Sequence, residues 1–98
     1  MSQYTLVLDP AAKADTKKID PTTLEQINRR IARVLERPEL GKPLTGSLAG
    51  LRSVYAADKR YRVVYAVDQN ARTVTVLAIG ARQAGHRSDP YAKARRRT

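Results

Sequence analysis

The spacing of apolar residues predicts one long helix in the first half of the chain. Over residues 21–36, apolar side chains recur every three or four positions, the spacing of one helical face: Leu24, Ile27, Ile31, Val34 and Leu35. Asp20-Pro21 provides an N-cap and a proline at the first helical position. Arg37-Pro38 ends the helix, because the residue before a proline avoids helical backbone angles.

Apolar and polar residues alternate in the second half of the chain, which predicts three strands. The expected strands cover about 51–57, 60–68 and 72–80. The turns between them are short, so we expect an antiparallel meander. Residues 4–8 add a short β-rich run, and a short polar helix follows over 11–19. Segment 38–50 holds three of the five glycines and two prolines, which is typical of a loop.

The expected elements follow the order β-α-α-β-β-β and end in a basic C-terminal segment over about 84–98. Such an order predicts an α+β fold in which two helices pack on one face of a meander sheet. A chain of 98 residues without tryptophan or phenylalanine has room for one domain, residues 1–98, with a modest aliphatic core. We see no repeats and no second domain.

Composition excludes several classes of protein. No apolar run reaches the length of about 18 residues that a membrane-spanning helix needs, and the N-terminus lacks the basic start of a secretory signal. The chain has no cysteine and one histidine, so we expect no disulfide, no metal site and no cofactor. These features fit a cytoplasmic protein that does not contact a membrane.

Positive charge is concentrated in the second part of the chain. The net charge is +10; residues 40–98 carry twelve Lys/Arg against three Asp/Glu, whereas residues 1–39 carry seven against six. A field of this size favours polyanionic partners, which are either a nucleic acid, the ribosome or an acidic protein segment.

The most strand-like segment, YRVVYAVD, places an arginine near its start. If Asp58-Lys59 forms a two-residue turn, Tyr55 lies opposite Arg62, and Ser53 shares their face of the sheet. The turn lacks glycine, so a longer loop with a shifted register is the alternative. Arg62 then either belongs to a phosphate site or pairs with an acidic side chain at a half-exposed position.

Four segments, in this order and at this spacing, resemble the RelE/ParE superfamily of bacterial toxins: GKPLTGSLAGLRSVY, YRVVYAVD, VTVLAIGAR and the short basic tail. The resemblance covers nearly the whole chain and implies the toxin of a type II toxin–antitoxin system. RelE-like members cut messenger RNA in the ribosomal A site, whereas ParE-like members inhibit DNA gyrase. Both kinds are neutralised by a cognate antitoxin encoded beside them.

This resemblance implies three alternatives for the chain. The first is a ribosome-dependent messenger-RNA endoribonuclease that needs no metal, with messenger RNA and the ribosome as partners. The second is a non-enzymatic gyrase inhibitor, and the third is a toxin-fold nucleic-acid-binding module without activity. In each case we expect an antitoxin whose acidic segment wraps the toxin in a hetero-oligomer.

The resemblance also implies the residues that would act. Arg62 corresponds to the sheet arginine of RelE-like members and Arg82 to the arginine that follows their last strand. Both would stabilise the reacting phosphate, since a guanidinium binds two oxygens and stays charged. Tyr91 corresponds to their C-terminal tyrosine. His86 is the alternative acid or base, because its ordinary pKa suits either task.

In one respect the chain departs from the RelE pattern. Some RelE-like members carry two further basic residues on the second strand, where this chain has Ser53 and Tyr55. The expected RNA contacts are Arg52, Tyr55, Lys59, Arg60, Arg87, Arg95, Arg96 and Arg97, with the last three in a flexible tail. The helix residues Arg29, Arg30 and Arg33 are expected either to meet the antitoxin or to keep the helix surface solvated.

Overall fold

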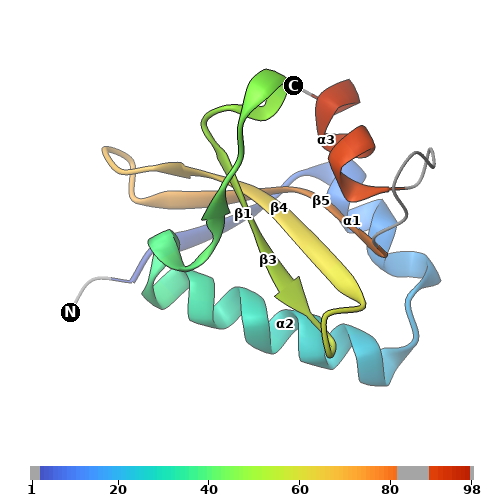
Figure 1. Cartoon of the computed structure of the whole chain (residues 1–98). Coiled ribbons are helices and arrows are strands. Elements are labelled where there is room, and N and C mark those ends of the chain that lie inside the picture. Colours follow the sequence, from blue (N-terminus) through green and yellow to red (C-terminus); the bar gives the residue numbers. More distant parts are fainter. Residues whose placement is uncertain (1–2, 82–88, 98) are drawn as a thin grey trace.

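The computed structural model describes residues 3–81 and 89–97. Its helices and strands (Figure 1) are β1 Thr5–Leu8, α1 Pro10–Asp15, α2 Pro21–Glu36, β2 Lys42–Pro43, β3 Leu51–Ala56, β4 Tyr61–Asp68, β5 Thr73–Ala81 and α3 Pro90–Arg97. Short 3-10 turns cover Thr16–Lys18, Pro38–Leu40 and Gly46–Leu48. The predicted α+β class is confirmed, and β2 and α3 are additions that the sequence pattern did not predict.

The strands form one sheet with the order β1-β5-β4-β3-β2. The predicted antiparallel meander is confirmed for β3, β4 and β5, whereas β1 runs parallel to β5. β1 pairs with Thr73–Val76 alone, so the rest of that edge of β5 has no strand partner among the described residues. Side chains of α3 contact this uncovered edge at the carbonyl oxygens of Leu77 and Ile79.

Both N-terminal helices begin at an aspartate followed by a proline. The carboxylate of Asp9 accepts a hydrogen bond from the Ala11 amide at 2.9 Å, and that of Asp20 accepts one from the Thr23 amide at 3.0 Å. α2 has the predicted bounds. α1 is shorter than the predicted 11–19: its α-helical part ends at Asp15, and a 3-10 turn continues it.

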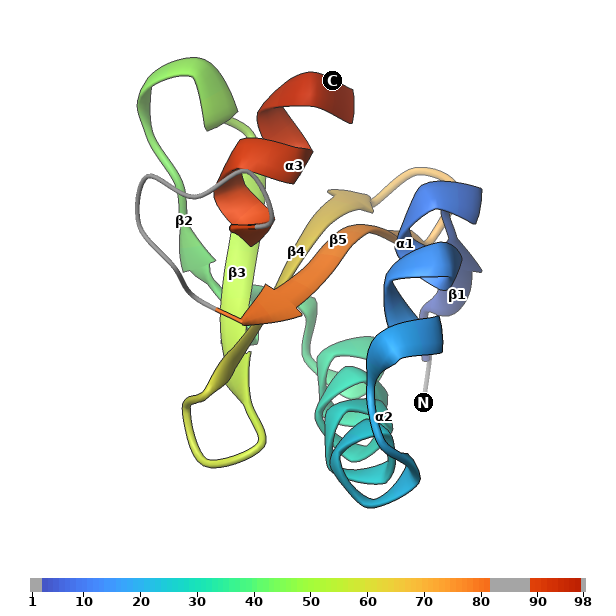
Figure 2. The same ribbon diagram turned by 90° about the vertical axis from the view of Figure 1, so that its right-hand side faces the viewer.

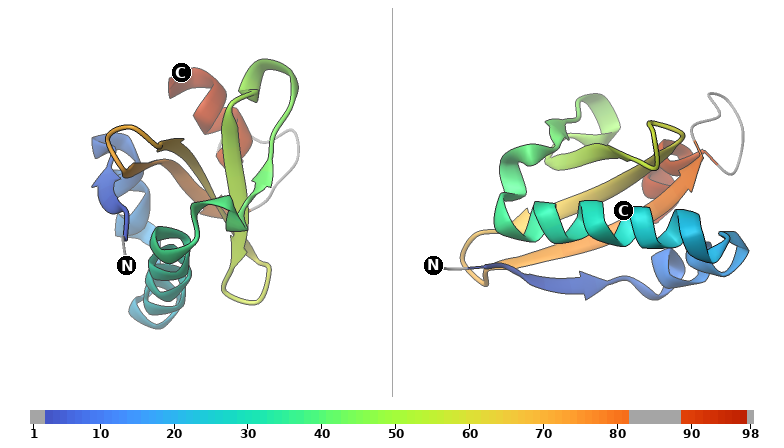
Figure 3. Two further views of the ribbon diagram at one scale, coloured as in Figure 1. Left: turned by 90° about the vertical axis from the view of Figure 1, so that its left-hand side faces the viewer. Right: turned by 90° about the horizontal axis from the view of Figure 1, so that it is seen from below.

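The larger core lies between the sheet and the helices α1 and α2, and Figure 3 shows α2 crossing the strands. Apolar side chains of α2 fill it from one side, namely Ile27, Ile31 and Val34. Strands β3 to β5 supply the other side with Val54, Val63, Tyr65, Val74, Val76 and Ile79. This burial fixes which face of each strand is turned away from the helices.

Tyr65 anchors the loop before β3 from inside this core. Its side chain is fully buried, and its hydroxyl donates to the Pro38 carbonyl at 2.7 Å and accepts from the Gly41 amide at 2.8 Å. A Cβ atom on Gly41 would lie 2.3 Å from that hydroxyl oxygen, so no larger residue fits there. The loop that carries β2 is thereby fixed against the sheet.

α3 covers part of the opposite face of the sheet, as Figure 2 shows. Ala94 is fully buried there, in a smaller cluster with Leu48, Val64 and Ala78. The expectation of a flexible basic tail over residues 95–97 is therefore wrong, because these arginines belong to a helix that packs on the sheet. Residues 84–88 and 98 of the expected basic segment lie outside the described residues.

Candidate functional site

A groove of about 680 Å³ opens on the α3 side of the sheet. Strands β2, β3 and β4, the loop after β2 and helix α3 all contribute to its lining. Its charged and hydroxyl-bearing lining residues are Arg30, Lys42, Thr45, Ser53, Tyr55, Arg62, Asp89, Tyr91 and Arg95. The groove therefore brings together the predicted sheet arginine and the predicted C-terminal tyrosine.

The strand register that shapes the groove is the predicted one. Tyr55 lies opposite Arg62, and Ser53 shares their face of the sheet. The turn between β3 and β4 has no glycine, yet Asp58 and Lys59 adopt φ angles of 57° and 69°, the sign that a tight hairpin turn needs. The register holds because the other face of β3 and β4 is buried in the core.

Arg62 lies stacked on an aromatic ring and has no acidic partner in the part of the chain that the structure describes. Its Cζ atom is 3.5 Å from the centre of the Tyr55 ring. Its Nε is buried without a hydrogen-bond partner, and no carboxylate within residues 3–81 and 89–97 forms an ion pair with it. Among the described residues, Arg62 therefore does not form the ion pair with an acidic side chain that was the alternative to a phosphate site. A guanidinium that lies over a ring and is not neutralised by a described carboxylate suits an anionic ligand.

The cations around Tyr55 lower the pKa of its hydroxyl. The Arg62 guanidinium lowers the pKa of Tyr55, first through hydrogen bonding to its hydroxyl and then through its charge, and Lys59 and Lys42 act in the same direction. The Lys59 ammonium lies 5.8 Å from the Tyr55 ring centre. With 41% of its surface exposed, Tyr55 can also present its ring to a ligand.

Tyr91 reaches the groove from the first turn of α3. Its hydroxyl oxygen lies 2.9 Å from the hydroxyl oxygen of the buried Ser53 on β3. Its amide donates to the carboxylate of Asp89, the residue before the helix, at 3.2 Å. Sequence reasoning missed this contact, because it noted only that Ser53 stands where some RelE-like members carry a basic residue.

Lys42 is a second groove residue that sequence reasoning missed. It belongs to β2, where it pairs with Ser53, and it adds a positive charge to the groove wall. The sequence offered only its place in a glycine-rich loop, and short edge strands such as β2 leave little pattern to detect. Lys42 therefore places a positive charge beside Ser53, the position at which some RelE-like proteins carry a basic residue.

Three arginines that were grouped as RNA contacts lie outside the groove lining. Arg52 donates to the Gly41 carbonyl at 2.6 Å. Arg60 donates from Nε to the Ala57 carbonyl of its own turn at 3.2 Å. Arg97 forms an ion pair with Asp15 at 2.9 Å. Each of these guanidinium groups has a partner within the fold, and the contact of these residues with RNA stays a prediction.

Of the other predicted contacts, Arg95 lines the groove, whereas Arg96 is exposed and does not line it. Arg82, His86 and Arg87 lie outside the described residues, so their roles stay predictions.

On the surface of α2, Arg29 pairs with Glu25, and Arg33 pairs with Glu36 at 3.9 Å. Arg30 donates to the Tyr55 carbonyl at 3.0 Å. With Lys59, these three arginines line a shallower hollow of about 390 Å³, and their antitoxin contact stays a prediction.

Two negative findings concern the described residues. They contain no group of three or more His, Cys, Asp or Glu side chains that could hold a metal ion. No helix among them is long and apolar enough to cross a membrane.

Similarity to known proteins was found both in sequence and in structure. Residues 6–88 match the family described as ParE-like toxin of type II bacterial toxin-antitoxin system. The mRNA interferase toxin RelE of Escherichia coli is 31% identical over 97 residues, which cover 96% of each chain. Toxin RelE of Mycobacterium tuberculosis is 45% identical over 51 residues, about half of each chain.

Two solved structures share this fold over most of their length. A mutant of E. coli toxin RelE in the free state superposes with a TM-score of 0.78 at 27% identity, covering 97% of both chains. The toxin of the M. tuberculosis RelBE2 toxin–antitoxin complex superposes with a TM-score of 0.75 at 31% identity, covering 84% of this chain and 94% of that one. The chain therefore belongs to the ParE-like toxins of type II bacterial toxin–antitoxin systems and is similar to their RelE members.

Proposed function

We propose that the chain is a RelE-type toxin that cuts messenger RNA on the ribosome without a metal ion. The observation that carries this proposal is Arg62, which lies over the Tyr55 ring in the groove and forms no ion pair with a carboxylate of residues 3–81 and 89–97. A cation placed in this way is ready to receive a phosphate. The name of the E. coli relative, mRNA interferase toxin RelE, supports the same activity.

The proposed reaction uses the RNA's own 2′-hydroxyl as the nucleophile. The 2′-oxygen forms a bond to the adjacent phosphorus while the bond from phosphorus to the 5′-oxygen breaks. The products are a 2′,3′-cyclic phosphate and a free 5′-hydroxyl. A base takes the proton from the 2′-hydroxyl, an acid gives one to the leaving 5′-oxygen, and Arg62 stabilises the negative charge that builds on the phosphate oxygens.

Tyrosines supply the candidate acid and base within the groove. Tyr91 lies against Ser53 at its wall, and His86 is the alternative from outside the described residues. Tyr55 joins them, because neighbouring cations lower its pKa and so favour its deprotonated form. Arg82 keeps its proposed role as a second phosphate ligand.

Lys42 and Lys59 replace the charge that Ser53 and Tyr55 do not provide. Both contribute to the positive environment of Tyr55, one from β2 and one from the β3–β4 turn. Cations that surround the reacting phosphate lower the cost of its developing charge wherever they are anchored in the sequence. The departure from the RelE pattern is therefore a different placement of charge around the same groove.

The proposed partners follow from the neighbours in structure. Solved complexes of RelE with RelB from M. tuberculosis and E. coli support a cognate antitoxin as the partner of this chain. An acidic segment of that antitoxin would neutralise part of the net charge of +10. The proposed place of action is the cytoplasm, where ribosomes and messenger RNA are found.

A gyrase inhibitor is the second candidate. The matched family takes its description from ParE, and the neutral side chains of Ser53 and Tyr55 depart from the pattern of cleaving members. In this alternative the groove would bind protein rather than RNA. The two candidates differ in which cellular process stops first.

Primer extension on a defined messenger RNA in a translating extract tests the proposal. Ribosome-dependent cuts at codon positions are expected for the wild type and are expected to vanish in Arg62→Ala. Arg72→Ala is the matched control, because Arg72 also lies over a tyrosine ring, that of Tyr4, at 4.8 Å but away from the groove. A toxic wild type that leaves the RNA uncut and blocks DNA supercoiling by gyrase would replace the proposal with the second candidate.

A further inference from the structure

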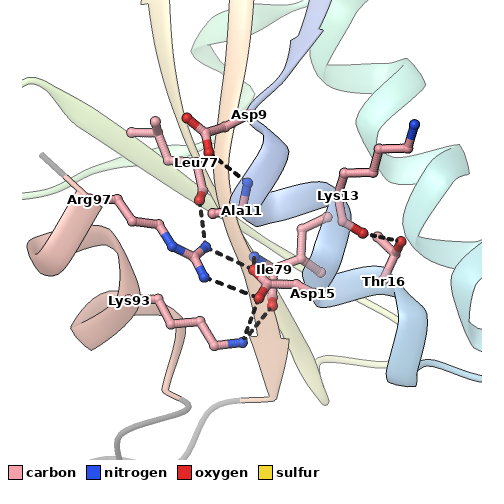
Figure 4. Close-up of polar contacts among 9 residues, drawn as sticks. All are labelled: Asp9, Ala11, Lys13, Asp15, Thr16, Leu77, Ile79, Lys93 and Arg97. Carbon is pink, nitrogen blue, oxygen red and sulfur yellow. Dashed lines mark hydrogen bonds and ion pairs between the residues drawn. The ribbon is translucent and has the colours of Figure 1, made fainter.

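A buried aspartate closes the part of the β5 edge that β1 leaves uncovered. Asp15, the last residue of α1, accepts a hydrogen bond from the Ile79 amide at 3.1 Å. Its side chain is only 8% exposed. Figure 4 shows its carboxylate lying between β5 and α3, where it meets two cations from the helix.

The two cations come from one face of α3. Lys93 and Arg97 are four residues apart and therefore lie above one another on the helix. The Lys93 ammonium lies 3.1 Å from Asp15 Oδ1 and 3.2 Å from the Ile79 carbonyl oxygen. The Arg97 Nη1 lies 2.9 Å from Asp15 Oδ2 and 2.8 Å from the Leu77 carbonyl oxygen. With side-chain exposures of 16% and 21%, both cations are largely withdrawn from solvent.

These contacts matter because α3 is short. It has eight residues, of which Pro90 and Ala94 are buried, and helices shorter than about 12 residues are marginal in isolation. α3 therefore depends on its contacts with the sheet. The Asp15 carboxylate joins it to a segment that is 78 residues away from Lys93 in sequence.

The same helix carries the groove tyrosine. Tyr91 precedes Lys93 by two residues, so it points to a different side of α3, where its hydroxyl meets Ser53. Arg95 also reaches the groove lining, in contrast to Arg97 two positions later. One side of α3 therefore contacts Asp15 through Lys93 and Arg97, and another side contacts the groove through Tyr91.

We propose that Asp15 is a positioning residue, which holds α3 through Lys93 and Arg97 so that the Tyr91 hydroxyl stays at Ser53 in the groove. Asp15 itself does not line the groove. The part of this proposal that concerns catalysis rests on the proposed function. The part that concerns docking of the helix does not.

The charge of Asp15 is suited to this task. Burial alone would raise the pKa of Asp15, but hydrogen bonds from Arg97, the Ile79 amide and Lys93 outweigh that effect and lower it. The carboxylate is therefore ionised at neutral pH and can bind both cations. An asparagine at position 15 would keep the shape and one acceptor for the Ile79 amide while losing the charge.

Hydrogen exchange of the full-length chain tests the docking directly. In Asp15→Asn we expect the α3 amides, such as that of Lys93, to exchange about 10- to 100-fold faster, while the amides of β4 keep their wild-type rates. Asp68→Asn is the matched control, because Asp68 accepts a hydrogen bond from the Ala71 amide in an exposed turn. Unchanged protection of α3 in Asp15→Asn would overturn the proposal.

Cleavage kinetics test whether the position of Tyr91 is what Asp15 controls. We expect Asp15→Asn to lower kcat about 10- to 100-fold with little change in KM, because misplacing a reacting group affects the chemical step. In a Tyr91→Phe background the same change should have less than about a twofold further effect, since the group it positions is already gone. An equal loss of kcat in both backgrounds would overturn the positioning of Tyr91.

Two further variants keep these outcomes separate. Lys93→Met removes one cation while Arg97 still pairs with Asp15. It should therefore speed the exchange of the α3 amides by less than Asp15→Asn does. This variant tests the docking of α3 if Asp15→Asn does not fold. Ser53→Ala removes the contact of Tyr91 without touching the Asp15 cluster, so α3 should keep most of its protection. If the wild type cut no messenger RNA, the proposed function would fail, and the exchange data would still decide whether Asp15 docks α3.

Discussion

Arg62 and Arg97 show how differently one fold can use the same residue type. Arg97 binds a buried carboxylate and a backbone carbonyl, so its charge is neutralised within the protein. Arg62 lies on the Tyr55 ring, and among the described residues its buried Nε has no hydrogen-bond partner and no carboxylate neutralises its charge. The partners of a cation, rather than its exposure or its place in a basic run, separate a binding residue from a structural one.

The largest expected difference between the two arginines is in activity. Arg62→Ala should lower the rate of messenger-RNA cleavage about 100- to 1000-fold, because it removes a donor to the charge that builds on the phosphate. Arg62→Lys should recover only a small part, since an ammonium cannot bind two phosphate oxygens in the same plane. Single-turnover cleavage on programmed ribosomes measures both rates. A lysine variant that cleaves like wild type would contradict the role given to the guanidinium.

The free energy of unfolding should depend more on Arg97 and Asp15 than on Arg62. Arg97→Met should cost about 1–3 kcal/mol of unfolding free energy and Asp15→Ala about 2–4 kcal/mol, because each leaves buried charged or polar groups without a partner. Arg62→Ala should change it by no more than about 1 kcal/mol. Urea unfolding followed by circular dichroism gives the three values. If Arg62→Ala were the most destabilising of the three, the comparison would fail.

Acid should reveal the Asp15 cluster. The pKa of Asp15 in the folded chain lies below its ordinary value of 3.8, so its contribution to stability is complete above that value and is lost as the pH falls through the lower, folded-state pKa. Asp20 at the start of α2 has a shift of the same sign, caused mainly by hydrogen bonding to Thr23. Wild type should therefore lose more stability than Asp15→Asn as the pH falls from about 5 to about 2. Parallel urea midpoints in the two proteins would contradict this.

The smallest expected effect is in the titration of the tyrosines. Arg62 lowers the pKa of Tyr55, whereas burial raises the pKa of Tyr65. Absorbance of tyrosinate should therefore show one early and one late titration, and Tyr55→Phe should remove the early one. Arg62→Ala should move the early titration upward, whereas Arg72→Ala should leave it in place. An early titration that survives in Arg62→Ala would mean that Arg62 is not its cause.

The sequence allowed much of the fold to be predicted where the causes are local. Both ends of α2 were predicted correctly because Asp20-Pro21 and Arg37-Pro38 act on their own neighbours. The pairing of Tyr55 with Arg62 was also correct, since alternation and a short turn determine it. In contrast, β1 pairs with a strand more than 60 residues away, and no local pattern indicates such a contact.

The site was predictable only where it depends on local sequence patterns. Arg62 and Tyr91 could be proposed from their motifs, but the meeting of Tyr91 with Ser53 depends on a helix whose sequence consists mainly of basic residues and alanines. The sequence ARRR does not distinguish Arg95, which lines the groove, from Arg97, which binds Asp15. That difference arises from helical geometry and from a carboxylate about 80 residues earlier in the chain.

The central claim is that the charge of Arg62 meets a phosphate of the RNA. The most direct measurement is the affinity for programmed ribosomes whose messenger RNA lacks the reactive 2′-hydroxyl, taken as a function of salt concentration. We predict that Arg62→Ala lowers the slope of log affinity against log salt by about 0.7, the value for one phosphate contact on a single strand, whereas Arg72→Ala leaves it unchanged. An Arg62→Ala variant with the wild-type slope would show that Arg62 does not contact a phosphate.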